Sequence, residues 1–112
     1  MTDIDIFPTR YQVTGLDPND EDAHVWSINI EWRGPGDLWA VCRIERCLST
    51  TGTWDYEPSP SNRTDEYRAT HRFPLKEAKR LATEAYPKLI INGLWVRNGI
   101  LEPADTVRSE MP

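Results

Sequence analysis

A change in the spacing of apolar residues near Pro74 constrains the fold of this chain more than any other feature. Between residues 23 and 33, apolar side chains occupy every second position, which predicts a strand with one buried face. That face is expected to comprise Trp26, Ile28, Ile30 and Trp32. After Pro74 the apolar residues recur at helical spacing, and a proline at the first position of a helix loses no hydrogen bond. The helical stripe comprises Leu75, Ala78, Ala82, Ala85 and Tyr86.

Alternation and turn residues predict further strands before this helix. The predicted segments are Tyr11–Leu16, Leu38–Leu48, Thr53–Glu57 and Thr64–Phe73. Within Leu38–Leu48 the apolar residues change face after Val41, so either both faces are partly covered or a bulge shifts the register. Several strands followed by one helix predict an α+β fold: an antiparallel sheet of about four to five strands, with one amphipathic helix (about 74–86) packed on one face.

Asn92-Gly93 lies between two apolar runs, which is a strong signal for a two-residue hairpin turn. In such a hairpin Ile91 faces Leu94 and Ile90 faces Trp95; a loop that plugs the core is the alternative. The chain of 112 residues has the length of one domain. We expect a single domain over residues 1–101 and a polar C-terminal tail over residues 102–112.

The chain contains no apolar run long enough to cross a membrane and no secretory signal, which predicts a cytoplasmic protein without membrane contact. The two cysteines, Cys42 and Cys47, are five positions apart. On one continuous strand they would lie roughly 16 Å apart on opposite faces, and they cannot bridge unless a bulge or turn intervenes. Both are expected to be reduced thiols.

The charge distribution argues against general nucleic-acid binding. The net charge is −5, and residues 1–32 carry seven acids and one base. Residues 33–97 carry eleven bases and eight acids, which is a small excess compared with that of duplex-binding domains. The acidic loop at residues 17–22 is expected to be a solvated turn rather than a calcium site.

The chain lacks the recognised motifs for phosphate binding, nucleophilic catalysis and metal binding. We therefore predict no enzyme activity, no catalytic residue, no cofactor and no metal site. A metal site would require Cys42, Cys47, His24 and His71 to converge in space without close spacing in sequence. His24 follows the acidic loop, and a small hydrolase centred on this histidine is an alternative function.

Aromatic and arginine residues supply the candidates for an interface. Trp39 and Trp54 lie near turns, and an exposed tryptophan beside arginine is typical of a protein interface or of a platform for single-stranded nucleic acid. The interface candidates are Trp39, Trp54, Arg43, Arg46, Arg63, Arg68 and Arg72. On the predicted strand, Arg68 and Arg72 share a face. These arginines could form a surface patch that faces an anion. The equally favoured alternative is that acids on neighbouring strands, Glu45, Asp55 and Glu57, neutralise their charge.

Four segments resemble small uncharacterised proteins of actinobacteria and their phages. They are Trp39-Ala40-Val41-Cys42-Arg43, Arg46-Cys47-Leu48, Gly52-x-Trp54-x-Tyr56-Glu57-Pro58 and the helix from Phe73 to Ala85, and the resemblance covers roughly residues 4–94. It implies an accessory protein of a phage or prophage that binds a host component. It implies no activity and no functional residue.

The leading hypothesis is a small non-enzymatic, phage-derived accessory protein that binds a host protein in the host cytoplasm. Single-stranded nucleic-acid binding through the same arginines and tryptophans is the first alternative, and the His24 hydrolase is the second. An unpaired outer strand of the sheet would favour a homodimer.

Overall fold

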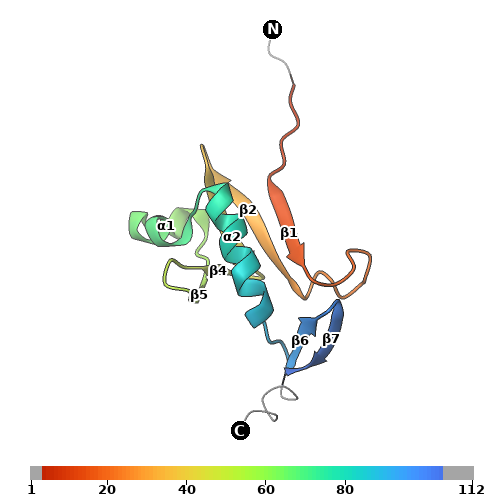
Figure 1. Ribbon diagram of the computed structural model, residues 1–112. Helices are drawn as coiled ribbons and strands as arrows, with labels where there is room; N and C mark the ends of the chain where they lie inside the picture. Colours follow the sequence, from red (N-terminus) through yellow and green to blue (C-terminus); the bar gives the residue numbers. More distant parts are fainter. Residues whose placement is uncertain (1–3, 105–112) are drawn as a thin grey trace.

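The computed structural model describes residues 4–104 and confirms the α+β class (Figure 1). Five strands form one antiparallel sheet in chain order: β1 (Arg10–Thr14), β2 (Ser27–Gly34), β3 (Leu38–Arg43), β4 (Arg46–Leu48) and β5 (Trp54–Tyr56). Two further strands, β6 (Leu94–Arg97) and β7 (Ile100–Pro103), form a separate sheet. The helical elements are η1 (Pro60–Asn62), α1 (Asp65–His71), α2 (Leu75–Ala85) and η2 (Tyr86–Lys88). Within this described part of the chain, no helix has both the length and the apolarity needed to span a membrane.

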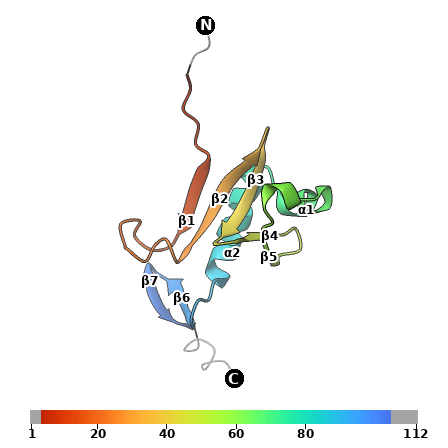
Figure 2. The ribbon, with the colours of Figure 1, turned by 180° about the vertical axis from the view of Figure 1, so that it is seen from behind.

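The predicted amphipathic helix is confirmed as α2, which begins directly after Pro74 and lies across one face of the sheet. It is in front of the sheet in Figure 1 and behind it in Figure 2. Ala78 and Ala82 are fully buried, and these small side chains allow the helix to lie close to the strands. The core beneath them comprises Ile28, Ile30, Trp39, Val41, Leu48 and Phe73. Asp37 fixes the start of the helix, because its carboxylate accepts a hydrogen bond from the Leu75 amide.

The structure reverses the expectation for two of the tryptophans. Trp26 is buried as predicted, but Trp32 is 44% exposed. Trp32 lies at the end of β2, where the pairing register shifts, and its indole N–H donates to the Gly36 carbonyl in the following turn. Trp39, expected at the surface, is buried in the core, where its backbone pairs with Phe73. Trp39 is therefore a structural residue.

The segment predicted as one strand, Leu38–Leu48, is two strands joined by a two-residue turn. Cys42 pairs with Cys47 and Arg43 pairs with Arg46, so the chain reverses at Ile44-Glu45. The change of apolar face that indicated a bulge reflects this reversal. Ile44 has φ 54°, a left-handed conformation that usually requires glycine or asparagine.

The strand predicted over Thr64–Phe73 is wrong, because residues 65–71 form helix α1. The Thr64 side chain accepts a hydrogen bond from the Tyr67 amide, which caps the helix. Acidic residues occupy its first turn and Arg68 and His71 its last, an arrangement that suits the helix dipole. Tyr67 and His71 stack with ring centroids 4.1 Å apart, since residues four apart share one helical face. Residues four apart also share one face of a strand, so the same spacing fits a strand. This explains why the segment was predicted as a strand.

The turn predicted at Asn92-Gly93 is confirmed, but the hairpin around it is short. Ile91 and Leu94 exchange backbone hydrogen bonds, and both turn residues have positive φ. The pairing ends there, and Ile90 is 47% exposed instead of facing the next strand.

Strand β6 pairs with β7 instead, through a second Asn-Gly turn at residues 98–99 with the same positive φ values. Strand β7 extends to Pro103, beyond the predicted domain boundary at residue 101, and Ala104 is buried. The remainder of the predicted tail, residues 105–112, lies outside the described residues.

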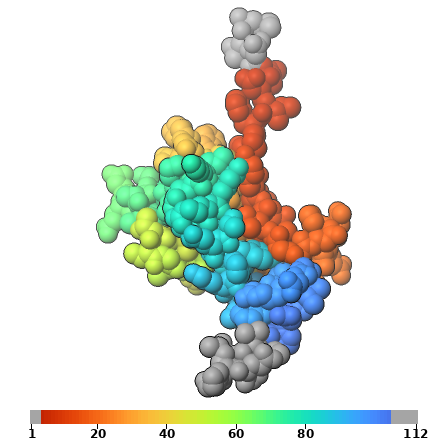
Figure 3. Space-filling model, in the orientation of Figure 1, coloured from red at the N-terminus to blue at the C-terminus, as the bar shows by residue number. Residues whose placement is uncertain are grey.

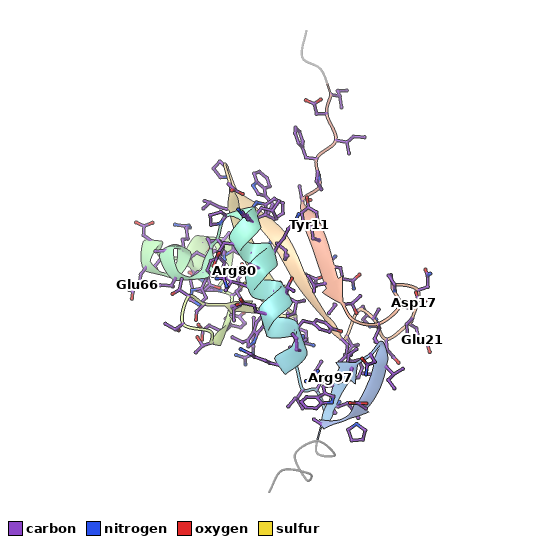
Figure 4. The ribbon with its side chains drawn as sticks, in the orientation of Figure 1. Tyr11, Asp17, Glu21, Glu66, Arg80 and Arg97 are labelled. Atoms are coloured by element: carbon purple, nitrogen blue, oxygen red, sulfur yellow. The ribbon has the colours of Figure 1, made fainter. Side chains whose placement is uncertain are left out.

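Two acidic segments lie at opposite sides of the molecule, as Figure 4 shows for Asp17 and Glu21 on one loop and Glu66 on α1. In the loop, the Asp17 carboxylate accepts a hydrogen bond from the Asn19 amide, and Asp20 accepts one from the Asp22 amide. These contacts stabilise the loop's own turns, as expected of a solvated segment. The N-terminal segment from residue 4 to 9 projects from the body of the molecule (Figure 3).

We expect the substitution Ile44→Gly to raise the free energy of unfolding by about 0.5 to 1 kcal/mol, because the left-handed conformation costs a β-branched residue more than it costs glycine. Ile44 is 86% exposed, so the lost side chain removes little burial. Urea denaturation at neutral pH measures the change. The matched control is Ile90→Gly at an ordinary φ, which should be neutral or destabilising. A lower stability of Ile44→Gly than of the parent protein would contradict the strain at this turn.

Candidate functional site

A hollow of about 440 Å³ lies between the β3–β4 turn, strand β5 and the segment after α2. We call it the basic groove. Its lining residues are Arg43, Ile44, Glu45, Arg46, Trp54, Tyr56, Lys88, Leu89 and Ile90. It contains three of the predicted interface candidates, which are Trp54, Arg43 and Arg46. The sequence therefore predicted part of this site, although it placed the surface elsewhere.

The strand register explains why these side chains meet. Trp54 and Tyr56 are two positions apart on β5, so they point to the same face of the sheet. Arg46 is the cross-strand partner of Tyr56, and Arg43 is the partner of Arg46, so both arginines share that face. This is the face that α2 covers, and the groove begins beside the end of the helix, where η2 supplies Lys88.

The groove combines exposed apolar side chains with three basic residues, Arg43, Arg46 and Lys88, against one acid, Glu45. Ile44 and Tyr56 are 86% and 62% exposed, and Trp54 is half-buried between them and the core. Among the described residues, no carboxylate forms an ion pair with Arg43, Arg46 or Lys88. The groove therefore presents a surface that favours a negatively charged ligand with apolar groups.

Arg43 is held in place by backbone carbonyls rather than by an acid. Its guanidinium donates to the Ser27 carbonyl at 3.2 Å and to the Val25 carbonyl at 2.7 Å. Burial lowers the pKa of this guanidinium, without removing its charge at neutral pH. Arg43 is thus a fixed cation at one end of the groove, whereas Arg46 is exposed.

The opposite face of the same strands carries a cluster of ion pairs centred on Glu57. Arg33 donates from two nitrogens to the two carboxylate oxygens, at 2.8 and 3.0 Å. Arg72 contacts the same carboxylate at 2.9 Å and Arg63 at 3.4 Å. We call these four residues the Glu57 cluster. Two interface candidates, Arg63 and Arg72, therefore have a structural role.

The shared face predicted for Arg68 and Arg72 is wrong. Arg72 is buried with the Glu57 carboxylate, whereas Arg68 is exposed on α1 and pairs with Asp65. The two side chains share a face only if the segment is a strand, and it is a helix. The alternative reading, in which Glu57 neutralises nearby arginines, is correct for Arg72. Arg33 was missed, because it directly precedes a glycine-proline turn and has no neighbouring signal in the sequence.

The charges around Glu57 outweigh the effect of its burial. Burial raises the pKa of this carboxyl, but the hydrogen bond from Arg33 and the charges of Arg33, Arg63 and Arg72 lower it to about 2. Glu57 is therefore ionised in the folded protein throughout the neutral and mildly acidic range. Loss of one partner from these ion pairs is strongly destabilising, because it leaves buried charges uncompensated.

The two cysteines lie directly beside this cluster. The Sγ atoms of Cys42 and Cys47 are 3.2 Å apart, and both residues are buried. The separation of roughly 16 Å for one continuous strand does not apply, because the exception of an intervening turn is met: the turn at Ile44-Glu45 makes the two residues cross-strand partners. Together with Glu57, they form a group whose ligand atoms lie within 4.8 Å of one another.

Neither histidine joins the cysteines. His71 is buried, and its Nε2 lies 2.8 Å from the Asp55 carboxylate. This contact lowers the pKa of Asp55. His24 is exposed, and among the described residues it lines neither the basic groove nor the hollows beside Trp32 and beside Leu81. The structure thus adds no support for the His24 hydrolase.

Searches of protein-family models, curated proteins and solved structures found no match to this chain.

We expect acid to weaken the fold through Glu57. Its folded pKa of about 2 lies below the ordinary value of 4.5, so its stabilising contribution is complete above about pH 5 and is lost as the pH falls toward 2. The full difference in pKa corresponds to about 3.4 kcal/mol, and solvent screening of the partly exposed ion pairs reduces the contribution to about 2–3 kcal/mol of unfolding free energy. Urea denaturation between pH 7 and pH 2.5 should show this loss.

The variant Glu57→Gln tests the assignment. It should be less stable than the parent by about 3 kcal/mol at pH 7, and its stability should depend less on pH. The control Glu66→Gln changes an exposed acid on α1 and should retain the parent profile. Equal acid sensitivity of Glu57→Gln and the parent would show that another group carries the effect.

Proposed function

We propose that this chain is a small non-enzymatic accessory protein that binds a host protein in the cytoplasm. The basic groove takes an acidic segment of that partner with bulky apolar side chains. The charge and shape of the groove support this partner chemistry. The phage origin and the host identity of the partner rest on the sequence resemblance alone and stay predictions.

The conformation and exposure of Ile44 are the main support for this proposal. It is a β-branched residue in a left-handed conformation, and it is 86% exposed at the mouth of the groove. Glycine or asparagine would stabilise this turn, and a polar residue would be better hydrated. A residue that is unfavourable for both stability and solubility is typical of a binding site.

The neighbouring groups supply the remaining features of a protein interface. Tyr56 and Ile90 add exposed apolar area beside Ile44, and Trp54 forms a half-buried anchor point. The cations of Arg43, Arg46 and Lys88 surround this apolar centre, as in interfaces with an apolar core and a polar rim. Because the chain as a whole carries a net charge of −5, this local positive charge would orient an acidic partner toward the groove.

Selection from a displayed library of short random peptides tests the proposal. We expect the recovered peptides to carry Asp or Glu beside Trp, Phe, Leu or Ile. In titrations with a recovered peptide, Arg46→Glu and Ile44→Asp should each weaken binding about tenfold or more, equivalent to ~1.4 kcal/mol.

The control for charge is Arg68→Glu, which changes an exposed arginine on α1 outside the groove. It should alter the dissociation constant by less than about twofold, since exposed ion pairs contribute little. Recovery of basic peptides, or an equal loss in Arg68→Glu and Arg46→Glu, would show that the groove does not bind an acidic segment.

Single-stranded nucleic acid is the second candidate ligand, because Trp54 and Tyr56 lie beside three cations in the same groove. It predicts that oligothymidylate quenches the tryptophan fluorescence at low salt and that added salt reverses the quenching. The net charge of −5 disfavours this ligand. Quenching without recovery of any acidic peptide would select it over a protein partner.

A further inference from the structure

We infer that Cys42 and Cys47 form a redox-active dithiol, which a small hydroperoxide oxidises to a cross-strand disulfide. The site lies on the face of the sheet opposite the basic groove, and the observations that support it do not depend on the proposed binding function. Its basis is the 3.2 Å approach of two buried sulfur atoms in a chain that has no other cysteine.

The strand register already provides the geometry of a disulfide. Arg43 and Arg46 close the two-residue turn, so Cys42 and Cys47 are the next pair along the hairpin. In antiparallel strands this next pair is not joined by backbone hydrogen bonds, and its Cα atoms lie about 4.5 Å apart. Disulfides span Cα separations of roughly 4.4–6.8 Å, so the bond can form without a shift of the backbone.

The surroundings favour ionisation of one sulfur while the other keeps its proton. The hydrogen bond between the two thiols raises the pKa of Cys42 and lowers that of Cys47. Burial and the Glu57 carboxylate oppose ionisation of Cys47, whereas the hydrogen bond from Cys42 and the charge of Arg72 favour it and outweigh them. The guanidinium of Arg33 lies 3.8 Å from the Cys42 sulfur. A thiolate is the reactive form of cysteine, and nearby guanidinium groups stabilise it.

Oxidation proceeds in two displacements. The Cys47 thiolate attacks one oxygen of hydrogen peroxide, so an S–O bond forms, the O–O bond breaks, and the departing hydroxide takes up a proton as water. The sulfur of Cys42 then attacks that of Cys47, so the S–S bond forms and the S–O bond breaks. The second hydroxide also leaves as water. In total, two thiols and one peroxide yield one disulfide and two waters.

The size of the oxidant follows from the burial of the site. Cys42 is 3% exposed and Cys47 is fully buried, so a bulky disulfide such as oxidised glutathione has no direct route to either sulfur. Hydrogen peroxide is about the size of two waters. It requires only local opening of β4 and β5, which are three residues each.

A metal ion is a poorer occupant of the same place. Glu57, the third potential ligand, already accepts from Arg33, Arg63 and Arg72. A divalent cation would have to displace these contacts and remain beside three positive charges, which strongly disfavours binding. The three guanidinium groups that oppose a cation also offset the negative charge of Glu57 beside the sulfurs.

Treatment of the folded full-length protein with hydrogen peroxide tests the inference. After removal of peroxide, remaining thiols are alkylated under denaturing conditions, and the cysteine peptides are examined by mass spectrometry. We expect the loss of two hydrogens from the linked peptides, no alkylation, a monomeric product and full reversal by dithiothreitol. Oxidised glutathione at equal concentration should react at least tenfold more slowly.

Single substitutions provide the controls. In Cys42→Ser and Cys47→Ser no intramolecular bond can form, so the remaining sulfur should gain oxygen or stay alkylatable. Because both variants disturb a buried pair, near-ultraviolet circular dichroism verifies their fold, and the parent protein alone suffices if they unfold. Alkylation of both cysteines after peroxide treatment would overturn the inference. So would linkage between molecules, or retention of one added zinc ion per chain with both thiols protected.

Discussion

The two-residue reversal at Ile44-Glu45 is the constraint on which the rest of the structure depends. It sets Arg43 opposite Arg46 and Cys42 opposite Cys47. Because neighbouring residues of a strand point to opposite faces, one turn assigns the arginines to the groove and the cysteines to the other side. A shift of one residue would exchange these two sets, placing the arginines beside the Glu57 cluster and the thiols in the groove.

The two helices stabilise this arrangement in different ways. Helix α2 covers its face by apolar packing, with Ala78 and Ala82 close to the strands. Helix α1 and the residue that follows it act largely through polar contacts, because His71 pairs with Asp55 and Arg72 with Glu57. Apolar packing tolerates changes that conserve volume, whereas a buried charge cluster requires each partner. The α1 face is therefore the more sensitive to pH and to single substitutions.

The sequence predicted the elements that depend on local periodicity. Alternation located β2, and the stripe from Leu75 to Ala85 located α2, since each pattern extends over more than two turns or pleats. It failed at α1, where a seven-residue segment satisfies both periods and the Thr64 cap decides between them. It also failed at Ile44, because no turn-forming residue marks the reversal. Of the site, Arg43, Arg46 and Trp54 were predicted, but the groove that joins them depends on that turn.

Strain and exposure coincide at Ile44, and the surrounding structure explains how the chain tolerates them. The left-handed conformation costs an ordinary residue about 1–2 kcal/mol. Strand β3 pairs with β2 and strand β4 pairs with β5, so both sides of the turn are anchored. These strand contacts offset the conformational cost at Ile44. The residues between the two cysteines are also residues that line the groove. A bond between the sulfurs would close a covalent ring around the strained turn, and it would thereby restrict the wall of the groove from the opposite face of the sheet.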